Sequence, residues 1–198
     1  MNKTKEVSTK GTGKKHMSAA YMIRISIFSA IAFVVMYLEF PIAALFPAFL
    51  QIDLSDVIIF VGGVTMGPMA VVFIELVKNL LHLMLRGGTG GVGELANFMV
   101  GVSLLLPPVI IYRKYQSMLS LVLGMVAGVI AMVLVASVGN YYIFLPFYGV
   151  TGEAVMENII AVYAPFNLVK GSIVGLVAIT LHQSIKGIYK YITLTPND

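Results

Sequence analysis

The chain contains no cysteine and few charged residues, and both absences narrow what it can be. Without cysteine it forms neither a disulfide framework nor a cysteine-ligated metal site. Charged residues make up 11% and hydrophobic residues 59% of its 198 residues, and the mean hydropathy is +0.93. Soluble domains contain about 25% charged and roughly 45–50% apolar residues. The composition therefore predicts an integral membrane protein, and the length leaves room for one compact bundle.

Sequence motifs for nucleotide binding and catalysis are missing as well. No G-x-x-x-x-G-K-[ST] motif occurs, so the chain itself has no P-loop for ATP. Residues 88–93 match the dinucleotide fingerprint G-x-G-x-x-G, but they join two apolar runs and belong to no βαβ unit. The three histidines have no spacing at which two of them could share a metal ion with a carboxylate. We therefore expect a non-enzymatic chain without a metal or a resident cofactor.

The net charge of +4 is concentrated at the start of the chain, which argues against nucleic-acid binding. The lysines that precede the first apolar run are Lys3, Lys5, Lys10, Lys14 and Lys15. This start is too polar and too long for a signal peptide. We expect residues 1–21 to form a mostly disordered cytoplasmic tail, residues 22–190 a membrane domain, and residues 191–198 a C-terminal tail.

Six apolar runs predict an all-α integral membrane protein with a bundle of six transmembrane helices. A bilayer core is about 30 Å thick and requires roughly 20 apolar residues of helix. The second run is short by this standard, so five spans with a re-entrant or interfacial segment are the alternative. The runs are residues 22–40, 55–66, 68–85, 95–112, 118–145 and 162–185.

Lysine and arginine collect on one side of this predicted bundle. The side that holds the N-terminal tail also holds Arg24, Arg113, Lys114, Lys186 and Lys190. The other side holds only Arg86. Because positive residues remain on the cytoplasmic side, we expect both termini inside and an even number of spans. The outer loops, residues 41–53, 86–94 and 146–161, are the longer and chemically more varied ones.

Polar side chains interrupt three of the apolar runs near their predicted outer ends. Glu94 and Asn97 are three residues apart, as are Asn167 and Lys170, and Asn140 closes the fifth run. Ionisable groups inside a membrane are costly and indicate a functional site by default. A single polar residue could serve helix packing alone. Three spans that present such groups at one depth indicate a binding site.

These side chains also indicate the class of the ligand. An asparagine amide both donates and accepts, whereas a lysine ammonium only donates. Together they complement a planar edge that reads acceptor, donor, acceptor, as in a uracil-like imide. The residues expected to cover the ring or line its site are Phe46, Leu50, Tyr141 and Tyr148. A neutral, partly aromatic molecule of vitamin size fits, whereas phosphate does not, because the outer face is acidic.

A second polar cluster follows helical spacing in the third run. It consists of Glu75, Lys78, Asn79 and His82. Such a cluster could relay protons, and the chain would then be a proton-coupled carrier for a small aromatic or vitamin-like solute. Glu75 and Lys78, three residues apart, can also neutralise each other within the bundle, and we favour this structural interpretation.

Five short motifs, in this order along the chain, resemble one family. They are IAFVVMYLEFP, QIDLSD, GELANF, GNYYIFLPFY and PFNLVKG. From about residue 22 to residue 186 the chain resembles the riboflavin-specific substrate-binding subunits, or S components, of energy-coupling factor (ECF) vitamin importers. The resemblance implies a multi-pass protein of the bacterial cell membrane that binds riboflavin from outside. It also implies a membrane coupling protein and two cytoplasmic ATPases as partners.

The resemblance implies roles for individual residues. The fourth to sixth helices and the first outer loop would enclose the vitamin. Positions that match the binding motifs are Asn97, Asn140, Asn167, Lys170 and Glu94. The family docks its coupling protein through Ala-x-x-x-Ala on the cytoplasmic half of the first helix. This chain has Ser26 and Ala30 there, which keeps two small residues at that spacing but not the first alanine.

Overall fold

The computed structural model describes residues 18–87 and 89–193, with side chains as far as Ser184. The lysines of the predicted N-terminal tail and the side chains of Lys186 and Lys190 lie outside this part. Helix α1 already begins at Ala19, and the last helix continues to Thr193. Both helices therefore extend past the boundaries predicted for the membrane domain.

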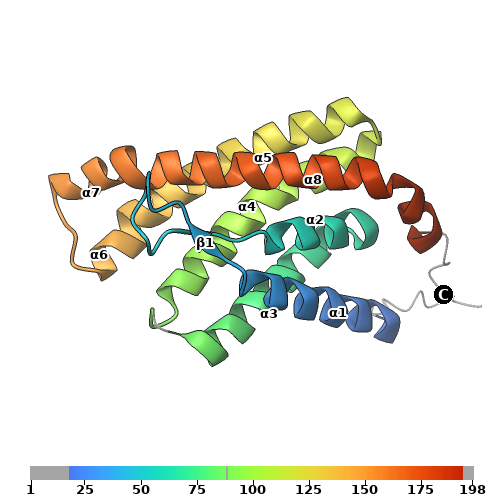
Figure 1. The fold of residues 1–198 in the computed structure, drawn as a ribbon, viewed down its shortest axis with the longest axis horizontal. Helices are drawn as coiled ribbons and strands as arrows, with labels where there is room; N and C mark the ends of the chain where they lie inside the picture. The colour runs from blue at the N-terminus through green and yellow to red at the C-terminus, as the bar shows by residue number, and fades with distance from the viewer. Residues whose placement is uncertain (1–17, 88, 194–198) are drawn as a thin grey trace, which may run out of the picture.

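Helices that run side by side form the body of the molecule (Figure 1). The helices before the fifth apolar run are α1 (Ala19–Met36), α2 (Ser55–Met66), α3 (Pro68–Arg86) and α4 (Val92–Tyr115). The next stretch is continuous and consists of α5 (Met118–Gly139), the π-helix η1 (Asn140–Phe144) and α6 (Leu145–Phe147). The last consists of α7 (Glu153–Asn158), the π-helix η2 (Ile159–Tyr163) and α8 (Ala164–Thr193).

The first helix ends earlier than the apolar run that predicts it. A turn follows Met36, and Phe40–Pro41 forms a short strand, β1, that pairs antiparallel with β2 (Gln51–Ile52). Proline biases the residue before it away from the helical conformation, so Pro41 favours the extended chain at Phe40. The segment predicted to be the first outer loop, residues 41–53, is therefore part of a hairpin rather than a plain connection.

Helix α2 is a short interior helix. Its twelve residues span about 18 Å at 1.5 Å per residue, less than the roughly 30 Å of a bilayer core. It contacts α1, α3, α4 and α8, and its Ile59 and Phe60 are fully buried. Gly67, with φ of +107°, separates it from α3. Among the described residues, five other helical stretches are long and apolar enough to cross a membrane.

Helices α4 and α5 approach each other closely at two glycines of α5. A Cβ atom at Gly124 would lie 2.6 Å from the Cα atom of Pro108, and one at Gly128 would collide with the carbonyl oxygen of Leu104. Proline has no N–H, so Pro108 cannot donate to that carbonyl, four residues before it. The glycines thus allow α5 to pack against the part of α4 that contains its prolines.

The two ends of the described chain lie at the same end of the bundle (Figure 1). Helix α1 starts there and α8 finishes there, and the turns after α2 and α4 are there too. The hairpin, the loop after α3 and the loop between α6 and α7 lie toward the opposite end. We call this opposite end the loop end.

Candidate functional site

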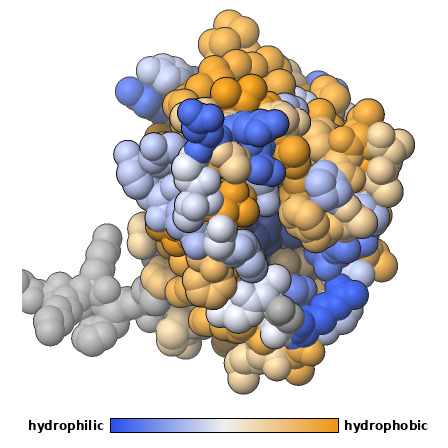
Figure 2. Space-filling view, turned by 90° about the vertical axis from the view of Figure 1, so that its left-hand side faces the viewer, coloured by the Kyte–Doolittle hydropathy of each residue, from blue (hydrophilic) through white to orange (hydrophobic). Residues whose placement is uncertain are grey.

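A cavity of about 770 Å³ lies at the loop end, within the usual size range of small-molecule sites. Viewed onto this end, Figure 2 shows polar residues around a central hollow, with hydrophobic residues at the perimeter. The hairpin, α3, α4, the α5–η1–α6 stretch and the η2–α8 stretch all contribute to its wall. Its apolar lining includes Met36, Phe49, Val100, Phe144, Leu145 and Phe166.

Most of the residues predicted from sequence line this one cavity. They are Leu50, Glu94, Asn97, Asn140, Tyr148, Asn167 and Lys170. Phe46 lies behind the wall, where its ring packs edge-to-face on the lining residue Phe166 with centroids 5.4 Å apart. Tyr141 is not brought to the cavity: it packs on Tyr142 and borders a separate depression. Its place beside Asn140 in the sequence turns it to another face of the helix.

The two asparagines beside the π-helices are held by their own helices. The amide nitrogen of Asn140 donates to the Ala136 carbonyl, and that of Asn167 donates to the Tyr163 carbonyl, both at 2.8 Å. Asn140 opens η1, and Tyr163 is the last residue of η2. Each amide retains its oxygen and one N–H for a ligand. Single π-helical turns occur frequently at functional sites.

Lys170 places a buried ammonium group in the cavity wall. Its side chain comes from α8, and only 4% of the residue is exposed. The ammonium nitrogen donates to the Asn97 amide oxygen of α4 at 3.0 Å. Since an ammonium has three N–H bonds, two remain for other acceptors.

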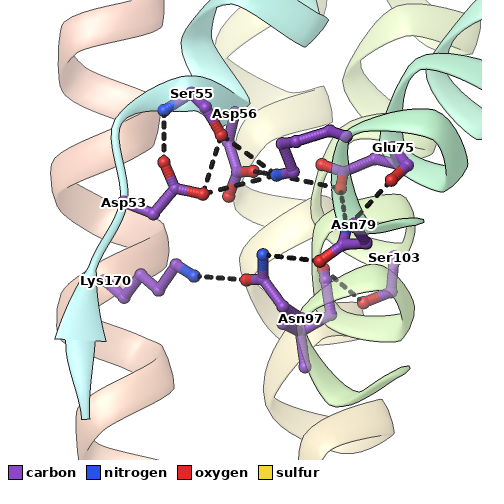
Figure 3. A network of polar contacts seen from close by, with 10 residues as sticks. Asp53, Ser55, Asp56, Glu75, Asn79, Asn97, Ser103 and Lys170 are labelled. Carbon is purple, nitrogen blue, oxygen red and sulfur yellow. Dashed lines mark hydrogen bonds and ion pairs between the residues drawn. The ribbon is translucent and has the colours of Figure 1, made fainter. Parts of the chain in front are cut away.

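A cluster of buried charges adjoins this part of the cavity (Figure 3). The Lys78 ammonium lies 3.0 Å from carboxylate oxygens of Asp56 and Glu75 and 3.3 Å from one of Asp53. Asp53 also accepts from the N–H and hydroxyl of Ser55, both at 2.7 Å. Burial acts to raise the pKa of Asp53, but the charges of Lys78 and Lys170 and the two Ser55 hydrogen bonds outweigh it and lower the pKa.

The polar cluster predicted in the third run is divided between two places. Glu75 and Lys78 form the expected ion pair, and Asn79 joins them by donating to Glu75. His82 pairs with Glu94 of α4 at 3.0 Å. The hydroxyl of Thr89 donates to the other oxygen of Glu94 at 2.6 Å. The predicted structural pairing of Glu75 with Lys78 is confirmed, and His82 belongs to the rim of the cavity.

The hairpin is joined to the end of α3 by a second polar cluster. Arg86 donates to Glu39 at 2.8 Å, and its guanidinium lies over the Tyr37 ring, 5.1 Å from the centroid. When the Gln51 amide is oriented with its nitrogen toward Glu39, that nitrogen donates to both carboxylate oxygens of Glu39, at 2.7 and 3.1 Å. Burial raises the pKa of Glu39, and the nearby charges of His82 and Arg86 only partly oppose it.

Sequence reasoning missed several residues of the cavity wall. Those with polar side chains are Glu39, Gln51, Asp53, His82, Thr89, Asn158 and Tyr163. Most lie in loops or at helix ends, where no apolar run surrounds them and their polarity does not stand out. The one available signal is the motif QIDLSD, in which Asp53 lies two residues before the apolar helix α2 and Asp56 is the second residue of that helix.

The residues predicted to dock a partner lie on the outside of α1. Ser26 and Ala30 are exposed, and their exposed neighbours include Ile23 and Ile27. The small residue that packs inward from this turn is Ser29, which is fully buried. Among the described residues, no group of three histidine or acidic side chains is arranged to hold a metal ion.

Comparison with known proteins gives consistent results. Residues 20–182 match the family described as ECF transporter, substrate-specific component. The riboflavin transporter RibU of Staphylococcus aureus (strain TCH60) is 38% identical over 177 residues, covering 86% of this chain and 93% of the relative. The riboflavin transporter FmnP of Bacillus subtilis (strain 168) is 33% identical over 170 residues, covering 81% and 89%. A solved structure of the S component of a bacterial ECF transporter superposes with a TM-score of 0.73 at 37% identity, covering 86% of this chain and 98% of that one.

Proposed function

This chain belongs to the substrate-specific components of ECF transporters, and we propose that it binds riboflavin and supplies it to an ATP-driven importer. Two relatives at 38% and 33% identity are riboflavin transporters. The observation that carries the proposal is the buried Lys170 ammonium among three asparagine amides in one cavity. A buried cation in a membrane protein is costly unless something complements it, and a ligand with carbonyl groups does so.

The chemistry of the cavity wall fits a flavin ring. One edge of that ring carries two carbonyl groups on either side of an N–H. The two N–H bonds that Lys170 retains can donate to carbonyl oxygens. The amide oxygens of Asn140 and Asn167 can accept from the ring N–H. Phe144 and Phe166 provide apolar surface for the faces of the ring.

We place the loop end outside the cell and both termini in the cytoplasm, with six helices across the bacterial cell membrane. The two ends of the described chain share one end of the bundle, which supports an even number of crossings (Figure 1). Arg113 and Lys114, at the end of α4, lie at that same end, in agreement with the positive-inside rule. In this arrangement α2 crosses within the bundle and is shielded from lipid by its neighbours.

The energy for import has to come from other subunits. The sequence contains no P-loop, so we assign ATP hydrolysis to two cytoplasmic ATPases and their connection to this chain to a membrane coupling protein. The exposed face of α1 around Ser26 and Ala30 is our candidate for contact with that protein. Small residues there allow close approach of helix backbones.

Binding of riboflavin by the purified chain tests the proposal directly. Riboflavin fluorescence should be quenched on titration with the protein in detergent, because the ring enters a desolvated site beside aromatic side chains. Thiamine, a vitamin without a flavin ring, should not compete. Absence of quenching, or equal competition by thiamine, would contradict the proposed substrate.

A further inference from the structure

We infer that Glu75 and Asn79 of α3 position the Lys170 ammonium through the amide of Asn97. Neither Glu75 nor Asn79 lines the cavity, so neither would contact a ligand bound in it. The inference rests on the proposed function, since it concerns the affinity of the same site for riboflavin. It assigns two positioning residues to the wall behind the binding residues.

A chain of hydrogen bonds connects α3 to α8 by way of α4 (Figure 3). The Asn79 amide nitrogen donates to a carboxylate oxygen of Glu75 at 3.0 Å. The Asn97 amide nitrogen donates to the Asn79 oxygen at 3.2 Å. The Lys170 ammonium donates to the Asn97 oxygen at 3.0 Å. The helices α3, α4 and α8 thus share one polar connection inside the bundle.

The donor-to-acceptor direction of this series of hydrogen bonds is fixed at both ends. At one end, the Glu75 oxygen that accepts from Asn79 also accepts from Lys78 at 3.0 Å. The Asn79 amide nitrogen additionally donates to the Glu75 backbone carbonyl at 2.9 Å, so both of its hydrogens are used. At the other end, the Lys170 ammonium can only donate. An amide turned around anywhere between them would place two donors or two acceptors against each other.

Helix packing leaves room for this arrangement at one glycine. A Cβ atom at Gly101 of α4 would collide with a carboxylate oxygen of Glu75. Glu75, Lys78 and Gly101 are all buried, and Asn79 is only 4% exposed. Buried polar groups that lose one partner are left with their full desolvation cost, so the bundle favours the orientation in which every amide is matched.

Holding Lys170 toward Asn97 matters because a carboxylate competes for it. Asp53 lines the same cavity, and the charge of Lys170 acts on it. A Lys170 ammonium released from Asn97 would be drawn toward that carboxylate and away from a ligand. The series of hydrogen bonds from Glu75 keeps the Lys170 ammonium where its two remaining N–H bonds can donate to a ligand in the cavity.

A double-mutant cycle separates this positioning role from a general structural one. Asn79→Leu removes the connection while conserving size, and we expect riboflavin binding to weaken about tenfold, the scale of one lost hydrogen bond to a charged group. In a Lys170→Met background the same substitution should change affinity by no more than about twofold, because residues that act through each other are not additive. Flavin fluorescence quenching measures all four affinities.

The matched control combines Asn79→Leu with Asn167→Ala in place of Lys170→Met. Asn167 contributes an amide to the cavity, but it is hydrogen-bonded to Tyr163 and does not belong to the series of hydrogen bonds from Glu75 to Lys170. There the two effects should multiply. Multiplying effects in both cycles, or unchanged affinity of Asn79→Leu, would overturn the inference, whereas a wild-type chain that does not bind riboflavin would overturn the proposed function. If Asn79→Leu does not fold, Glu75→Gln takes its place in both double-mutant cycles. Loss of the folded bundle in both variants would also overturn the inference, in favour of a purely structural network.

Discussion

At the scale of single residues, the site is built from few polar groups whose partners are largely within the protein. Asn140 and Asn167 each use one N–H on their own helix, and Lys170 uses one on Asn97. What remains for a ligand is therefore a small, directional set of donors and acceptors. The sequence indicated that each amide could both donate and accept, and the structure adds that one N–H of Asn140 and one of Asn167 are already used within the protein.

Removing one of these groups should weaken binding without unfolding the chain. For Lys170→Ala and for Asn167→Ala we expect an affinity loss of about 1.5–3 kcal/mol, or roughly 10–200-fold. Flavin fluorescence titration measures it. Ser172→Ala is the matched control on α8, because its exposed hydroxyl bonds only the Leu168 carbonyl of its own helix. Wild-type affinity in both variants would remove the site assignment.

At the scale of elements, the hairpin of residues 37–54 covers the cavity from one side. Leu50 and Phe49 line the cavity, and Phe46 packs on Phe166 of α8. Its two ends are anchored, through Glu39 to Arg86 and through Asp53 to Lys78. Arg86 and Lys78 both belong to α3, whereas Phe46 contacts α8. The hairpin therefore bridges the α3 side and the α8 side of the cavity and is suited to act as a lid.

Weakening the apolar contacts of this lid should mainly accelerate release. In the double variant Phe46→Ser and Leu50→Ser, we expect the dissociation rate of riboflavin to rise by more than the association rate falls. Stopped-flow measurement of flavin fluorescence gives both rates. Leu45→Ser serves as the control, since Leu45 is on the same loop but is 69% exposed and outside the cavity wall. Unchanged release in the double variant would mean that the loop only connects two helices.

The contact of α4 with α5 provides a second test at this scale. Gly128→Ala places a Cβ against the Leu104 carbonyl, so the helices must separate. Overpacking of this kind costs about 1–3 kcal/mol, and we expect a lower thermal unfolding temperature in detergent. At Gly175 of α8 a Cβ would lie 3.9 Å from Met125, which is an ordinary contact. Gly175→Ala should therefore leave the unfolding temperature unchanged or raise it, and equal behaviour of the two variants would contradict the packing argument.

At the scale of the whole molecule, the cavity and the small residues of α1 lie in different parts of the bundle. The cavity lies at the loop end, whereas α1 begins at the opposite end of the bundle (Figure 1), and Ser26 and Ala30 are the eighth and twelfth of its 18 residues. Neither of them lines the cavity. Ligand binding and partner docking should consequently be separable by mutation.

Ser26→Trp combined with Ala30→Trp should abolish ATP-driven riboflavin uptake by the assembled transporter. Binding of riboflavin to the isolated chain should stay near its wild-type affinity, because both side chains point out of the bundle. Uptake into proteoliposomes and fluorescence titration measure the two properties. Val126→Trp with Ile130→Trp makes the same change on the exposed face of α5 and should preserve uptake. Joint loss of binding and uptake in the α1 variant would contradict the docking assignment.

The sequence by itself determined that the chain is a membrane protein, where its helices lie, and which polar groups stand at the centre of the site. Apolar runs predict helices locally, because the backbone of a membrane span has to satisfy its own hydrogen bonds within that segment. A polar side chain inside such a run is costly and therefore conspicuous. Asn97, Asn140, Asn167 and Lys170 stood out for that reason, and all four line one cavity. Short local signals were also enough to locate α2, whose bounds match the predicted run at 55–66.

Only the tertiary structure decided which polar groups meet. The rotation of each helix about its axis depends on contacts between segments far apart in sequence, so Tyr141 could not be separated from Asn140 beforehand. The same holds for the pairing of His82 with Glu94 and for the hydrogen bonds that connect Glu75 to Lys170 through Asn79 and Asn97. Their partners are supplied by packing between helices, which no single segment of the chain specifies.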